Sequence, residues 1–192
     1  MRVVDCIGEV CPMPVIRTKK ALSESLGERL EIRVDNGISL ENVQKYIFSQ
    51  GHRDVVCITH DGYFAVVVNT DMMAKKVKSG DVDSIAIISS DAMGHGDDDL
   101  GRKLMHSFVY ALTQLDALPH KVVLYNRGVL LAAEDSLAME DLHVLAAMGV
   151  QILSCGLCVE HFDCADRLAV GEITDMYTIV ELMQGRNVMI RP

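Results

Sequence analysis

Four short, continuous apolar runs in the second half of the chain constrain its fold more than any other feature. They read SIAIIS, beginning at Ser84, then KVVLY, VQILS and NVMIR. Runs without alternation are typical of strands buried on both faces, as in parallel sheets. The segments between them look helical, with one apolar stripe running from Leu100 to Leu115. Strands that alternate with helices predict a doubly wound parallel α/β domain over residues 83–192.

The carboxyl ends of the strands in such a domain meet at one edge of the sheet, where ligands and chemistry gather. Three segments are expected at that edge: Ser90–Gly96, Asn126–Gly128 and Ser154–Cys158. The last of these contains two of the six cysteines, so this edge is a predicted site.

The first 69 residues show a different pattern, in which short elements of alternating type follow one another. RVVDCI and RLEIRVD are expected strands, with a helix from Pro12 to Leu26 between them. A second helix is expected to begin at a Ser39 cap, and DVVCITH and YFAVVVN follow as a hairpin around Asp61-Gly62. The order β-α-β-α-β-β predicts a two-layer sandwich over residues 1–69, in which two helices cover one face of a four-stranded sheet.

Residues 70–82 lack a clean periodicity and are predicted to link the two domains. The charge changes in the same region. Residues 1–80 carry 11 basic and 10 acidic side chains, whereas residues 81–192 carry 7 and 17. The difference, net +1 against net −10, also favours two units.

The composition excludes several classes of protein. The net charge of −9 argues against a nucleic acid or an anionic membrane as partner, because both favour clustered Lys and Arg. No apolar run approaches the roughly 18 residues that span a bilayer, and the first twenty residues lack the apolar core of a signal peptide. We therefore expect a cytoplasmic protein with mostly reduced cysteines and no partner of either kind. No bound cofactor is predicted.

Cys11 is the first candidate site residue, because it directly precedes Pro12 in the stretch DCIGEVCPMP. Proline favours the first helical position, so the sequence predicts Pro12 there and Cys11 at the N-cap. A thiol beside the free N–H groups and the positive end of a helix has a lowered pKa and is more often the nucleophilic thiolate. The alternative is a small, inert, buried residue at a turn. Cys6 and Cys57 are expected to be core residues.

Cys155 and Cys158 form the second candidate site, a C-x-x-C that follows the run VQILS at an expected helix start. Such a pair can form a disulfide or resolve a persulfide, and the first thiol is usually the nucleophile. His161 and Cys164 continue the three-residue spacing, which leaves a metal site and a structural role as alternatives. Four ligands at that spacing on one short helix drift around its axis, so no metal is predicted.

The motif D-x-x-G-x-x-C-P-x-P resembles the signature of the TusA/SirA sulfur-carrier family. The resemblance covers residues 1 to about 69 and implies the two-layer fold. It also implies that Cys11 accepts sulfur as a persulfide and passes it to another protein. The implied partners are a cysteine desulfurase or another sulfur or selenium donor protein, and an acceptor protein.

The rest of the chain resembles the DsrE-like domain that follows a TusA-like domain in YedF-type proteins. The similar segments are SDAMGHGDDDLG, YNRGVLL, GVQILSCGLC and VGEITDMYTIVELM. YedF-type proteins are called sulfurtransferase-like and are associated with selenium metabolism. The resemblance implies an acceptor cysteine at Cys155 and a homo-oligomer. The chain differs from the family pattern at Asp175, where that pattern has Asn.

Together these features predict a carrier of sulfur or selenium that passes a persulfide or selenopersulfide on Cys11 to partner proteins. Cys155 and Cys158 would receive, resolve or reduce that cargo. Whether this amounts to a sulfurtransferase with enzymatic turnover is left open. One alternative is a thiol-redox sensor or adaptor of sulfur or selenium metabolism, with Cys155 and Cys158 as its switch. Another is a module that binds a small anion or nucleotide, which rests on the fold alone.

Overall fold

The computed structural model describes residues 1–10, 12–25, 27–70, 84–185 and 188–192. The chain divides into two compact units, Met1–Lys78 and Ser79–Pro192, each with its own hydrophobic core. The candidate site residue Cys11 lies outside the described residues, as does all of the predicted linker 70–82 except its first residue. The boundaries of that linker therefore stay a prediction.

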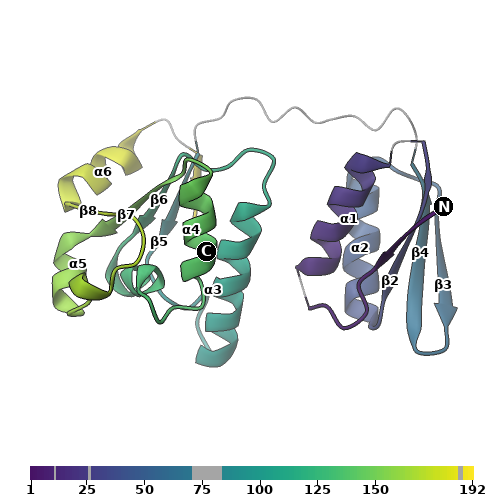
Figure 1. The fold of residues 1–192 in the computed structure, drawn as a ribbon, viewed down its shortest axis with the longest axis horizontal. Helices are drawn as coiled ribbons and strands as arrows, with labels where there is room; N and C mark the ends of the chain where they lie inside the picture. The colour runs from purple at the N-terminus through teal and green to yellow at the C-terminus, as the bar shows by residue number, and fades with distance from the viewer. Residues whose placement is uncertain (11, 26, 71–83, 186–187) are drawn as a thin grey trace. The chain divides into compact units, whose positions relative to one another are not determined.

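The first unit is a four-stranded sheet with two helices on one of its faces (Figure 1). The strand order is β1-β2-β4-β3, with β1 parallel to β2 and the other neighbours antiparallel. This arrangement confirms the predicted β-α-β-α-β-β two-layer sandwich. In chain order its elements are β1 (Arg2–Asp5), α1 (Met13–Glu24), β2 (Arg29–Val34), α2 (Gly37–Ser49), β3 (Val55–His60) and β4 (Tyr63–Asn69).

The core of the first unit forms where the alternating strand residues meet the helices. Leu30, Ile32 and Val34 of β2 are fully buried, and they belong to one cluster with Val43 and Ile47 of α2. The residues between them on β2 are more exposed, as the alternation predicts.

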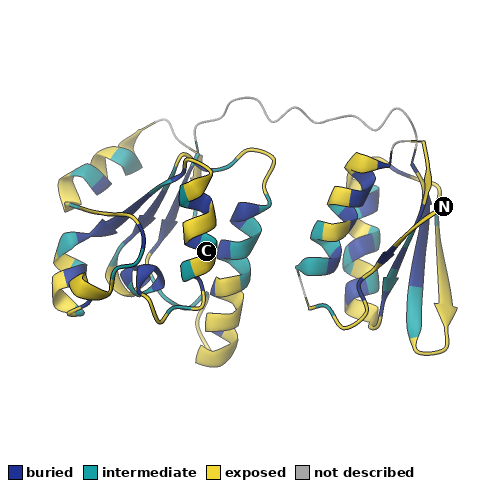
Figure 2. Ribbon diagram, viewed as in Figure 1, coloured by how far each residue is buried: buried dark blue, intermediate teal, exposed yellow. Residues whose placement is uncertain are grey.

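Strand β3 lies at the edge of this sheet and is exposed along most of its length (Figure 2). Val55, at its start, is the one residue of β3 that packs against the described core. The expectation that Cys57 is a core residue is therefore wrong. Its strand is the edge strand of the sheet, and the Cys57 thiol is exposed. Cys6, by contrast, is fully buried as expected.

Both helices of the first unit begin at residues other than the predicted ones. The N-cap of α2 is Asn36, whose side-chain oxygen accepts a hydrogen bond from the Ser39 N–H at 2.8 Å. Ser39 thus lies inside the helix and is not its cap. Helix α1 begins at Met13 with Pro12 in the cap position, one residue later than predicted. Pro14 falls in the first turn, where the missing N–H has no partner to lose.

The second unit contains a parallel five-stranded sheet with the order β8-β7-β6-β5-β9. Its strands are β5 (Ser84–Ile88), β6 (Lys121–Leu124), β7 (Gln151–Cys155), β8 (Glu172–Thr174) and β9 (Val188–Ile190). Its helices are α3 (Asp98–Thr113), η1 (Asn126–Ala132), α4 (Met139–Ala147), α5 (Gly156–His161), η2 (Ala165–Arg167) and α6 (Met176–Gln184), where η1 and η2 are 3₁₀ helices.

Buried strands occupy the middle of this sheet. Val122, Val123 and Leu124 of β6 are all fully buried, so the continuous apolar run reflects burial on both faces. After β8 the chain returns through α6 and adds β9 beside β5, which makes the sheet doubly wound as predicted. Strand β8 was not predicted, because it is short and mostly exposed. No helix among the described residues is long and apolar enough to cross a membrane.

Candidate functional site

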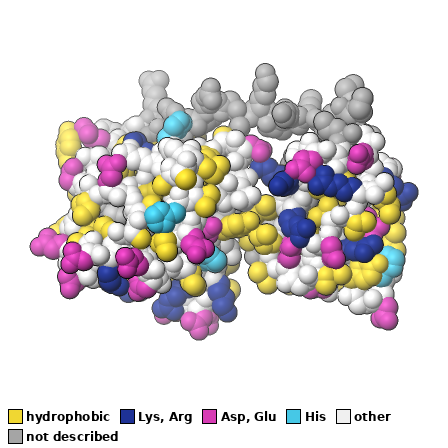
Figure 3. Space-filling model, viewed as in Figure 1, with side chains coloured by type: hydrophobic (Ala, Val, Ile, Leu, Met, Phe, Trp, Pro, Cys, Tyr) yellow, Lys and Arg dark blue, Asp and Glu magenta, His cyan; other side chains and the backbone are white. Residues whose placement is uncertain are grey.

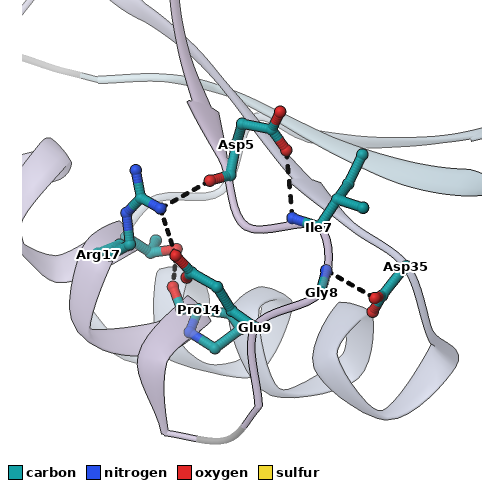
Figure 4. Close-up of polar contacts among 8 residues, drawn as sticks. Asp5, Ile7, Gly8, Glu9, Pro14, Arg17 and Asp35 are labelled. Carbon is teal, nitrogen blue, oxygen red and sulfur yellow. Dashed lines mark hydrogen bonds and ion pairs between the residues drawn. The ribbon is translucent and has the colours of Figure 1, made fainter.

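The loop between β1 and α1, which leads to Cys11, is held by hydrogen bonds from its backbone. The Ile7 N–H donates to Asp5 Oδ1 at 3.2 Å, and the Gly8 N–H donates to Asp35 Oδ2 at 2.7 Å (Figure 4). This second bond lowers the pKa of Asp35. Gly8 has a φ of +80°, in the left-handed region that favours glycine. Asp5 and Gly8 of the motif therefore shape the approach to Cys11.

Arg17 of α1 ties the same loop to the helix. Its Nη1 atom donates to the carbonyl oxygen of Asp5 at 2.7 Å and forms an ion pair with the Glu9 carboxylate (Figure 4). Burial, together with the negative charge of Glu9, raises the pKa of the Cys6 thiol to about 12. Cys6 therefore stays protonated at neutral pH and is a structural residue.

Basic side chains gather on one surface of the first unit (Figure 3). A hollow of about 270 Å³ beside β1 and α1 is lined by Arg2, Arg17 and Lys20, with Glu24 as its acidic residue. Arg2 forms an ion pair with Glu24 at 2.8 Å. The charged side chains that line the hollow therefore have a net positive charge, which suits an acidic surface on a partner.

In the second unit, the three segments predicted to meet at the carboxyl ends of the strands are joined by side-chain contacts. Arg127 donates through Nε and Nη2 to the two carboxylate oxygens of Asp91, both at 2.7 Å, and this pairing lowers the pKa of Asp91. The Asn126 N–H donates to the Sγ atom of Cys158 at 3.0 Å. The loop after β6 is thereby tied to the loop after β5 and to the start of α5.

Close packing fixes the position of Asn126. A Cβ atom added at Gly128 would lie 2.2 Å from the carbonyl oxygen of Ile88, so only glycine allows this approach to the end of β5. Asn126 itself has a φ of +51°, a conformation that Asn tolerates better than most residues. Sequence reasoning missed the contact of Asn126 with Cys158, because it is made by a backbone group of any residue type.

Cys155 and Cys158 are both free thiols, but their surroundings differ. Cys155 ends β7 and is 1% exposed. Cys158 is partly exposed and lines a hollow of about 310 Å³ together with Tyr125, Leu157, Phe162, Asn126 and His161. Burial raises the pKa of Cys158, and a hydrogen bond with the Cys155 thiol raises it further, whereas the Asn126 N–H acts in the opposite direction.

The remaining members of the cysteine and histidine series have other roles. Cys164 is fully buried, and its thiol donates to the carbonyl oxygen of Val159 at 3.6 Å. His161 lies in the wall of the hollow. Among the residues that the structure describes, no group of three or more His, Cys, Asp or Glu side chains could hold a metal ion.

Asp175, which stands where the DsrE-like pattern that this unit resembles has Asn, is the N-cap of α6. Its carboxylate accepts hydrogen bonds from the Thr178 N–H at 3.0 Å and from the Thr178 hydroxyl at 2.8 Å, and these bonds lower its pKa. Asn would offer the same oxygen to the helix start, so the departure preserves the cap.

Comparison with known proteins identifies the first unit. The family described as "Sulfurtransferase TusA" matches residues 2–70. A protein of Methanocaldococcus jannaschii, named "Putative sulfur carrier protein", is 36% identical over 69 residues, which span 35% of this chain and 92% of that protein.

Two solved structures are also similar to parts of the chain. A SirA-like protein of Desulfitobacterium hafniense is 36% identical, with a TM-score of 0.35, and the match covers 37% of this chain and 99% of that one. A protein of unknown function from Methanobacterium thermoautotrophicum is 24% identical, with a TM-score of 0.46, over 58% of this chain and 100% of the other. On the match of residues 2–70 and the identity to the M. jannaschii protein, the chain belongs to the TusA family of sulfur carriers.

Proposed function

We propose that the protein carries sulfur as a persulfide on Cys11 and passes it from a donor protein to an acceptor protein. The observation that supports this most is the membership of residues 2–70 in the TusA family, together with Cys11 in the C-P-x-P motif. A cysteine desulfurase is the proposed donor, because it produces sulfur already bound as a persulfide.

The surroundings of the motif support the proposal. Asp5, Gly8 and Arg17 take part in hydrogen bonds that hold the loop residues preceding Cys11, so this part of the loop needs no rearrangement when a partner binds. The hollow lined by Arg2, Arg17 and Lys20 offers positive charge to an acidic partner surface.

Mass spectrometry of the intact chain, after incubation with a cysteine desulfurase and cysteine, tests the proposal. We expect Cys11 to gain one sulfur in the wild type and no sulfur at this position in Cys11→Ala. Cys57→Ala is the matched control, because that thiol is exposed on β3 in the same unit. If loading of the wild type is no greater than loading of Cys11→Ala, the carrier function fails.

The second unit extends the proposal. We infer that Cys155 and Cys158 receive, resolve or reduce the cargo. The second unit resembles proteins associated with selenium metabolism, which makes selenium a second candidate cargo. The same resemblance supports a homo-oligomer, and so do the exposed apolar side chains of Leu100 and Leu104 on α3. Light scattering that gives the mass of one chain would contradict the oligomer.

A thiol-redox adaptor is the second candidate function. It is favoured by two free thiols three residues apart at the start of α5, Cys155 and Cys158, because such a pair can cycle between dithiol and disulfide. The measured potential of the pair decides this point. A value far below about −300 mV, where structural disulfides lie, would exclude regulatory cycling.

A further inference from the structure

The two thiols of the second unit differ in access, and the difference runs against the usual order in a C-x-x-C. Cys155, the first thiol, is 1% exposed at the end of β7 and belongs to the buried core cluster. Cys158, the second, is partly exposed and lines the hollow. A reagent in solution therefore reaches Cys158 first, while Cys155, at the N-cap of the same helix three residues earlier, is close enough to raise the pKa of Cys158.

The hollow around Cys158 is mostly apolar. Tyr125, Leu157 and Phe162 form much of its wall, and among the described residues neither an acidic side chain nor a Lys or Arg lines it. The sulfane sulfur atoms of a polysulfide or persulfide are soft and polarisable, so they suit contact with such aromatic and aliphatic side chains. The Asn126 N–H, 3.0 Å from Sγ, supports negative charge on the sulfur during exchange.

The position of that N–H is built into the fold. The Arg127–Asp91 pair and the close approach of Gly128 to Ile88 hold Asn126 at the end of β6. The donor is therefore in place before any ligand arrives and needs no rearrangement to meet the sulfur.

We propose that Cys158 is the thiol that takes an incoming sulfane sulfur and that Cys155 resolves it. The donor is a polysulfide or a small-molecule persulfide, and the inference rests on the proposed sulfur-carrier function. The Cys158 thiolate attacks the terminal sulfane sulfur, the sulfur–sulfur bond of the donor breaks, and the remainder of the donor leaves as a thiolate or a shorter polysulfide. The product is Cys158–S–S⁻.

In the second step the Cys155 thiol attacks the Sγ atom of Cys158. The Cys155–Cys158 disulfide forms, and the outer sulfur leaves as hydrosulfide with the proton of Cys155. The sulfane sulfur gains two electrons, and each of the two cysteine sulfurs loses one. No other oxidant is required, because the sulfane sulfur is itself the electron acceptor.

Sodium tetrasulfide is the probe for this inference, applied without oxygen to the reduced full chain carrying Cys11→Ala. After quenching with iodoacetamide, peptide mass spectrometry reads each cysteine. We expect a disulfide between Cys155 and Cys158. With Cys155→Ser added, a persulfide should remain on Cys158. With Cys158→Ser added instead, we expect at least about tenfold less persulfide on Cys155 than Cys158 carries in the Cys155→Ser variant. The reason is that the buried Cys155 thiol reacts only when the surrounding structure opens.

Cys164→Ser is the matched control, because Cys164 is buried in the same unit but lies outside the hollow. With Cys164→Ser added, the chain should form the Cys155–Cys158 disulfide to the same extent as the chain that carries Cys11→Ala alone. Circular dichroism checks that each variant is folded. The inference would be overturned if Cys155 in the Cys158→Ser variant carried as much persulfide as Cys158 does in the Cys155→Ser variant. A stable persulfide on Cys158 while Cys155 is intact would also overturn it. Since Cys11 is absent throughout, neither result depends on the loading of Cys11, which tests the carrier function separately.

Discussion

The loop that precedes Cys11 and the surroundings of Cys158 are held by different kinds of interaction. Charged and polar groups organise the loop that leads to Cys11: Asp35 accepts the Gly8 N–H, and Arg17 joins Glu9 and the carbonyl of Asp5. Around Cys158 the main contributions are close packing and a neutral backbone donor, with one ion pair, Arg127–Asp91, that supports the donor. The first site should therefore respond to changes in charge and backbone conformation, and the second to changes in volume. The following predictions test this contrast.

The largest effect is expected at Gly128, where volume is the limit. Gly128→Ala would place a Cβ atom 2.2 Å from the carbonyl oxygen of Ile88, so the backbone at the ends of β5 and β6 must move. We expect the free energy of unfolding to fall by about 3 kcal/mol or more. Urea unfolding followed by circular dichroism measures it.

Gly37→Ala is the control for this substitution. No atom in the described part of the chain lies within 4 Å of a Cβ built at Gly37, and its φ is outside the left-handed region. We expect the free energy of unfolding to change by no more than about 0.5 kcal/mol. If both variants lost the same free energy of unfolding, tight packing at Gly128 would not be what fixes the loop after β6, whose Asn126 contacts Cys158.

A smaller effect is expected at Gly8, where the backbone conformation, and not the available space, disfavours a side chain. No atom of a described residue lies within 4 Å of an added Cβ, but the φ of +80° is strained for any residue with a side chain. Gly8→Ala should lower the free energy of unfolding by about 1–2 kcal/mol. Gly8→Asn should cost less, because Asn tolerates the left-handed region. If the two variants are equally destabilised, the backbone angle is not the cause.

A pH-dependent effect is expected at Asp91, the charged element of the second site. Arg127 lowers its pKa, so the folded state favours the carboxylate. Its contribution to stability is fully present above the ordinary Asp pKa of about 3.9 and is lost as pH falls through the lowered folded value. Asp91→Asn should therefore narrow the difference in Tm between neutral and strongly acidic pH. A difference in Tm as large as that of the wild type would contradict the role of this pair.

The smallest effect is expected at Cys57. Because this thiol is exposed on the edge strand β3, Cys57→Ser should change the free energy of unfolding by less than about 0.5 kcal/mol. Iodoacetamide should modify Cys57 in the folded protein well before Cys6, which is fully buried and whose thiol has a pKa of about 12. Mass mapping after brief alkylation checks the order. Modification of Cys6 first would contradict it.

Much of the fold could be predicted because its signals are local. The alternation of Leu30, Ile32 and Val34 marks a half-buried strand, and the run at Val122–Leu124 marks a strand buried on both faces. The helix starts were less predictable. Asn36 and Ser39 are both good caps, and the choice between them depends on where β2 ends.

The features that could not be predicted depend on the neighbours that the fold supplies. Cys57 has the alternation of a core residue, and it is exposed because its strand lies at the edge of the sheet. The spacing of Cys155 and Cys158 indicates a thiol pair but does not indicate which sulfur faces the solvent. That depends on the packing of α5 against β7, which directly precedes it, and against η1, which lies far from it in the sequence.

Asp175 has a consequence for how sequences of this kind diverge. Asn and Asp cap a helix about equally well, since each has a short side chain with an acceptor oxygen. Their codons differ by one base, so the two residues can be exchanged in a single mutational event without disturbing the start of α6. Selection on folding therefore places little restriction on the exchange. Any selection at this position would act on the negative charge beside Thr174 and Tyr177.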